Sequence, residues 1–107
     1  MRESQDVEFK KNWRDEYMKT LCAFSNTNGG ILYIGIDDDG NIVGVKKVKE
    51  LLEKLPNKIR NSLGITPAIV LEGRDGEDVV KIEIGPSEIP VSFNGILYKI
   101  RFNNAGS

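Results

Sequence analysis

Residues 31–40 of the chain read ILYIGIDDDG, a run of apolar residues that ends in a polar turn. Most of the first six are β-branched or aromatic, and an Asp-Gly pair is a frequent connection between paired strands. A second β-branched run, NIVGV, follows directly at 41–45. We therefore predict a β-hairpin over residues 31–45, and the apolar first run predicts a central strand of a sheet.

Amphipathic helices are predicted on both sides of this hairpin. Over residues 12–26, apolar side chains recur at spacings of three and four, and Gly29 and Gly30 provide a stop signal. A second stripe of this kind covers residues 48–63 and ends before Gly64. Pro56 lies inside the second helix and is expected to kink it or divide it into two pieces, because proline lacks an amide hydrogen.

The remaining strands are predicted from alternation and turn residues. Val7 and Phe9 alternate with charged residues, as in a half-buried strand. Two further hairpins are expected, one with strands at 68–72 and 79–84, and one with strands at 91–93 and 96–102. These elements predict an α+β fold with a mixed, largely antiparallel sheet of hairpins and two main helices.

Composition limits the class of protein. The 107 residues fit one domain. The longest apolar run, 31–36, is far shorter than the roughly 20 residues of a spanning helix, so no membrane partner is expected. The polar N-terminus does not resemble a signal peptide, which favours the cytoplasm. A single cysteine, Cys22, lies in an apolar stripe and is predicted to be a buried structural thiol.

The chain contains no histidine, which excludes Ser-His and Cys-His catalysis and zinc sites built on imidazole. It also contains no GxxxxGK[ST] loop, so no ATP-binding loop is predicted. Fifteen basic and sixteen acidic residues give a net charge of −1. Because the total is nearly neutral, the distribution of charge matters more than its sum.

Basic residues concentrate between residues 46 and 60, where six lysines and arginines face two glutamates, a net +4. Such a helix could lie along nucleic-acid phosphates. The alternative is a solvated helix face with pairs such as Glu50 and Lys54. The residues predicted to bind nucleic acid are Lys46, Lys47, Lys49, Lys58, Arg60 and, from the last strand, Arg101.

Acidic residues form a second group of candidates. Glu3 and Glu8 flank the first strand, and the aspartates of 37–39 follow the predicted central strand. Carboxylates from these places could converge on Mg²⁺ or Mn²⁺, which can activate water for phosphodiester hydrolysis. The alternative is turn chemistry, since aspartate is favoured in turns for its hydrogen bonds to the backbone.

Three motifs carry a resemblance to a known family. They are ESQDVEFK at 3–10, LCAFSNTNGG at 21–30 and LYIGIDDDG at 32–40. In this order and at this spacing they resemble the motifs of the Schlafen AlbA-like domain, and the likeness extends from about Glu3 to Tyr98. The family commonly has an Arg-x-Gly-Ser segment after the late tyrosine, which this chain lacks.

The resemblance implies a single domain over residues 1–107, as the N-terminal module of a longer protein. Such proteins are described as transcriptional regulators or RecG-related ATP-dependent DNA helicases, so it implies nucleic-acid binding, with DNA favoured over RNA. One alternative is a metal-dependent endoribonuclease, for which family motifs assign catalytic and Mg²⁺- or Mn²⁺-binding roles to Glu3, Glu8 and Asp38. Another is an oligomerisation module. The animal relatives use two such lobes, so cleavage by this chain would need a homodimer or further domains, and a second copy is a candidate partner.

Overall fold

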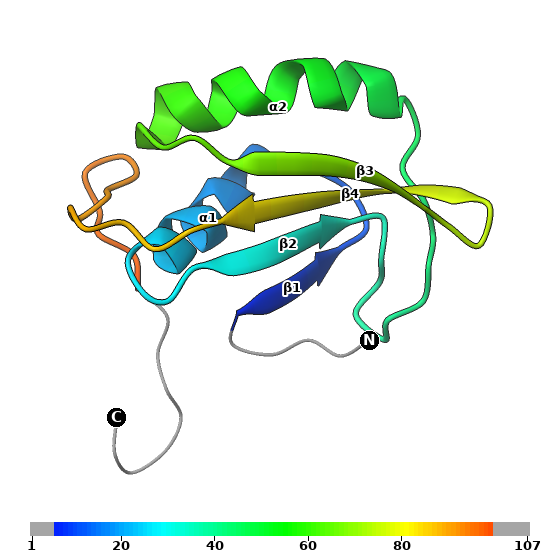
Figure 1. The fold of residues 1–107 in the computed structure, drawn as a ribbon, viewed down its shortest axis with the longest axis horizontal. Coiled ribbons are helices and arrows are strands. Elements are labelled where there is room, and N and C mark those ends of the chain that lie inside the picture. The colour runs from blue at the N-terminus through cyan, green and yellow to red at the C-terminus, as the bar shows by residue number, and fades with distance from the viewer. Residues whose placement is uncertain (1–5, 100–107) are drawn as a thin grey trace, which may run out of the picture.

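The computed structural model describes residues 6–99, in which four strands form one sheet with both helices on one face (Figure 1). The strand order is β1-β2-β4-β3, with one parallel and two antiparallel pairings. The predicted α+β fold with a mixed sheet is therefore confirmed. The elements are β1 (Val7–Lys10), the 3-10 turn η1 (Asp15–Tyr17), α1 (Met18–Ser25), β2 (Gly30–Ile34), α2 (Val48–Leu63), β3 (Ala68–Arg74) and β4 (Glu77–Ile84).

Strand β2 is central, as predicted. It pairs in parallel with β1 and antiparallel with β4, so that both of its edges are occupied. The prediction of a second hairpin strand at 41–45 was wrong for this reason, because no free edge of β2 remains for it. That segment makes a single bridge, between Ile36 and Ile42, and Val45 N–H then donates to the carbonyl of Asp78 at 2.9 Å.

Asp37 organises the turn that follows β2. Its Oδ1 accepts the backbone N–H groups of Asp39 at 2.9 Å and Asn41 at 2.8 Å, and its Oδ2 accepts the Asn41 side-chain amide at 3.2 Å. Chiefly because of the bond from the Asn41 N–H, the pKa of Asp37 lies below its ordinary value of about 3.8. The interpretation of this acidic run as turn chemistry is confirmed at Asp37.

The hairpin of β3 and β4 was predicted correctly, although its strands are longer than expected. Its turn residues, Asp75 and Gly76, have φ values of 52° and 77°. In the third predicted hairpin, only the bridge between Phe93 and Ile96 forms within the described chain, and the expected strand to residue 102 extends outside it.

Each helix differs from the prediction in one way: α1 begins later than expected, and α2 is not divided. The α-helix in the first region begins at Met18, since Arg14 is extended, with φ −136° and ψ 143°. The second region is one continuous helix of 16 residues, so the expected division at Pro56 was wrong. Leu55 and Ile59, on either side of Pro56, are both fully buried, so the helix packs against the core before and after the proline.

The main core lies between the helices and one face of the sheet. Leu32 and Ile34 of β2 pack there against buried residues of both helices. Successive strand residues point to opposite faces, and Tyr33 accordingly joins a smaller cluster with Phe9 on the other face. Within residues 6–99, neither helix has the length and apolar character needed to cross a membrane.

The end of α1 is tied to the late part of the described chain. Cys22 is fully buried, as predicted, and its thiol donates to the carbonyl of Val91 at 3.2 Å. The Asn26 amide donates to the carbonyls of Val91 and Tyr98 at 2.7 and 2.8 Å, while its Oδ1 accepts the Val91 N–H at 2.8 Å. These bonds fix residues 91–98 against the helix although they form no regular strand.

Leu55 provides a test of the core. Leu55→Ala should lower the free energy of unfolding by about 2–5 kcal/mol, because it removes a fully buried side chain and leaves a cavity. Urea denaturation measures the change. The exposed neighbour Glu53 is the control, and Glu53→Ala should shift the free energy by less than about 0.5 kcal/mol. Equal effects for the two variants would show that this face of α2 is wrongly placed.

Asp37 provides a pH-dependent test. Asp37→Ala should lower the melting temperature at pH 7, because the charged carboxylate accepts three hydrogen bonds only in the folded chain. A lowered folded-state pKa means that this stabilisation is present above about pH 3.8 and is lost as the pH falls through the lowered value. Wild type and variant should therefore converge in acid. Asp39→Ala is the control, and identical pH profiles for the two variants would contradict this role of Asp37.

Candidate nucleic-acid interface

A hollow of about 340 Å³ lies where the segment after β1 passes the first turns of α2. Three of its apolar side chains, Trp13, Val45 and Leu51, also pack against the main core. Four cationic side chains line the same hollow: Lys46, Lys47, Lys54 and Lys58. This region, called the Trp13 hollow below, thus combines an aromatic ring with a concentration of positive charge.

Helical geometry explains why these lysines meet. Successive residues of an α-helix rotate by about 100°, so positions 54 and 58 share one flank of α2. Lys47, at the N-cap of α2, lines the same hollow. Lys49 and Arg60 were predicted with them but lie on the other flank, and they are not among the lining residues. Arg60 donates to the side chain of Asn57 at 3.1 Å. Arg101 lies outside the described residues.

Asp15 connects the aromatic and basic parts of the hollow. Its Oδ1 accepts the indole N–H of Trp13 at 2.8 Å, and Lys58 Nζ lies 3.1 Å from its Oδ2. The hydrogen bonds from Trp13 and then Lys58 hold the pKa of Asp15 below its ordinary value. The carboxylate is therefore ionised at neutral pH, and it engages one of the four lysines.

Lys47 has an unusual backbone conformation. It is the N-cap of α2, with φ 54° and ψ 44°, and its side chain makes no capping hydrogen bond. A lysine in this left-handed region costs about 1–2 kcal/mol relative to the right-handed one, and glycine or asparagine is favoured there. Strain of this kind often accompanies functional positions.

Sequence reasoning missed Trp13, Asp15 and Lys54 as site residues. Trp13 and Tyr17 both fall within residues 12–26, where the spacing of apolar side chains predicts the buried stripe of a helix and therefore favours packing. The available signal was its position between the basic residues Lys11 and Arg14. Lys46, Lys47 and Lys58 were predicted from the charge of their segment, and the structure brings all three to the Trp13 hollow.

Of the three carboxylates predicted for metal-dependent cleavage, the structure describes two, Glu8 and Asp38. Asp38 is exposed in the turn after β2, and Glu8 on β1 lies 4.0 Å from Lys10 Nζ. Glu3 is outside the described residues. Within residues 6–99, no three histidine, cysteine or carboxylate side chains gather as metal ligands. The triad therefore stays a prediction.

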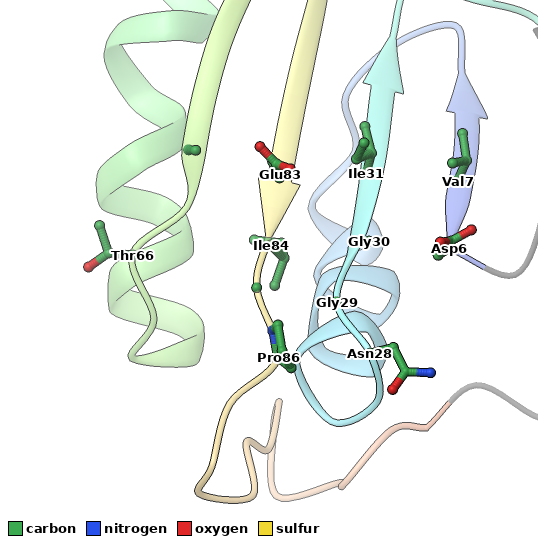
Figure 2. A pocket seen from close by; sticks show the side chains of 12 residues that line it. Asp6, Val7, Asn28, Gly29, Gly30, Ile31, Thr66, Glu83, Ile84 and Pro86 are labelled. Atoms are coloured by element: carbon green, nitrogen blue, oxygen red, sulfur yellow. The ribbon is translucent and has the colours of Figure 1, made fainter.

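A second hollow, of about 470 Å³, lies at the other end of the sheet (Figure 2). Main chain of Gly29, Gly30 and Gly85 contributes to its wall. Asp6 and Glu83 are its charged lining residues, and no lysine or arginine joins them among the residues that the structure describes. The charged lining of this hollow is therefore acidic, whereas four lysines line the Trp13 hollow.

Comparisons with known proteins agree with this architecture. The family model described as Schlafen, AlbA_2 matches residues 3–105. The DIP2311 protein of Corynebacterium diphtheriae shares the fold, with a TM-score of 0.71 and 24% identity over 87% of this chain. The match covers 20% of that protein, so this chain spans about a fifth of its length.

A second solved structure is the N-terminal domain of a RecG-related protein from Nitrosomonas europaea, which is named as a proposed ATP-dependent DNA helicase. It has a TM-score of 0.71 and 21% identity, and the match covers 97% of this chain and 83% of that one. At these identities the two structures show the fold alone. Because the family model matches nearly the whole sequence, the chain belongs to the Schlafen, AlbA_2 family.

Proposed function

We propose that this domain binds nucleic acid, and DNA in particular, by holding backbone phosphates at the Trp13 hollow. The observation that carries the proposal is the convergence of four lysines on one hollow in a chain whose net charge is only −1. Phosphate contacts supply much of the affinity of nucleic-acid-binding proteins and carry no sequence information directly. Family membership and the name of the Nitrosomonas protein support the same function.

The local charge balance favours phosphate binding. Two carboxylates, Asp15 and Glu50, line the hollow beside the four lysines. Lys58 is already engaged by Asp15, which leaves Lys46, Lys47 and Lys54 as the cations that we assign to phosphates. The N-terminal end of α2 adds a partial positive charge at the same place.

The strained backbone of Lys47 is a further argument. Asparagine or glycine would suit its left-handed conformation better than lysine does. A lysine there is explained if its charge is needed at the N-terminal end of α2.

We also propose that the domain is the N-terminal module of a longer protein, such as a transcriptional regulator or a RecG-related helicase-like protein.

Lys47→Asn separates binding from folding. The variant removes one positive charge but suits the left-handed backbone, so its melting temperature should not fall. Binding to a labelled DNA oligonucleotide is measured by fluorescence anisotropy at several salt concentrations. For wild type, the logarithm of the association constant should fall linearly with the logarithm of salt, and the variant should reduce that slope by about one unit.

Lys49→Asn is the matched control, since it removes the same charge from the other flank of α2. Its effect on the salt slope should be clearly smaller than that of Lys47→Asn. Equal slopes for the two variants would contradict the assignment of binding to the Trp13 hollow. Absence of DNA binding at low salt would overturn the proposed function itself.

A further inference from the structure

Trp13 is the only tryptophan of the chain, and its ring is held from two sides. The indole N–H donates to Asp15 Oδ1 at 2.8 Å. The ring of Tyr17 meets it nearly perpendicularly, with centroids 6.0 Å apart. Tyr17 in turn lies under Lys10 Nζ, 5.0 Å from the ring centroid. The orientation of the indole is thus fixed before any ligand arrives, which reduces the entropy cost of binding.

The surroundings of this ring match the chemistry of a single nucleotide. Val45 and Leu51 offer apolar contact beside the indole, and the lysines surround the same space. A hollow of about 340 Å³ falls within the range of roughly 300–1,000 Å³ that is typical of small-molecule sites. A flat base could contact the indole while its phosphate pairs with Lys46, Lys47 or Lys54.

We propose that Trp13 is a stacking platform for an unpaired base, so that the ligand of this domain is single-stranded nucleic acid. The inference rests on the proposed function and adds the strandedness of the ligand. Inside a duplex, both faces of a base are covered by its neighbours, and a protein ring reaches a base only when it is unstacked. Stacking tolerates any sequence, because every base has a π face.

The competing explanation is that Trp13 only fills space, since it also packs against the main core. The two explanations differ in what the ring responds to. A packing residue keeps the same environment when a ligand binds, whereas a platform is covered by the base. As the chain has one tryptophan, fluorescence of the whole 107-residue chain reports on Trp13 alone when it is excited at the long-wavelength edge, where the three tyrosines do not absorb.

The test compares three DNA ligands of equal length and mixed sequence: a single strand, its duplex, and an abasic strand that keeps the phosphates but lacks bases. The single strand should quench Trp13 fluorescence and bind more tightly than the other two. Trp13→Leu should weaken single-strand binding by about 5- to 150-fold, the equivalent of one stacked base. Trp13→Phe retains a ring and should keep most of the affinity.

Thermal melts establish that both variants are folded, and the Phe variant keeps the test valid if the Leu variant unfolds. Unchanged fluorescence together with equal affinity for all three ligands would overturn the stacking platform, while salt-dependent binding through the lysines would stand. Equal quenching by single strand and duplex would also overturn it. Failure of all three ligands to bind would overturn the proposed function, and this inference with it.

Discussion

The ring of Phe24 lies so close to Gly30 that a β-carbon there would sit 2.4 Å from a ring carbon. This contact joins the end of α1 to the start of β2. Gly29 adds a second constraint, with φ 83° and with the carbonyl oxygen of Ile84 2.6 Å from any β-carbon. The two glycines therefore do more than end a helix, because they let α1 lie directly on the central strand.

Once β2 is covered by α1 and paired on both edges, the chain that follows must leave the sheet. It turns at Asp37, and the N–H groups of Val43 and Gly44 both donate to the carbonyl of Gly35. Gly44 has a φ of 79°, a left-handed conformation that side chains rarely adopt, so the passage beside β4 favours glycine. This route brings Lys46 and Lys47 to the Trp13 hollow, and the sheet topology thus determines where the basic segment begins.

The elements that the sequence predicts correctly are those set by residues close together in the chain. Strand β2, the β3–β4 hairpin and helix α2 follow from local periodicity and turn residues, and all three were predicted. The path of residues 41–45 depends on the pairing of β2 with two other strands, and the prediction of a strand there was wrong. The start of α1 was also predicted wrongly, because Asp15–Tyr17 form a 3-10 turn before it. At the Trp13 hollow, charge alone indicated Lys46, Lys47 and Lys58, whereas the proposed role of Trp13 depends on α2, which lies far along the chain.

Asp15 has two opposite effects in the Trp13 hollow: it fixes the ring of Trp13, and its negative charge offsets part of the positive charge of the lysines. Its carboxylate fixes the Trp13 indole and holds Lys58, and its lowered pKa keeps it charged at neutral pH. A negative charge beside the proposed phosphate site weakens its long-range attraction for phosphate, and a phosphate near Lys58 would share that ammonium with Asp15. In return the ring keeps one orientation without a ligand. In the proposed function, Lys58 is therefore part of the support for Trp13, while Lys46, Lys47 and Lys54 are the lysines assigned to phosphates.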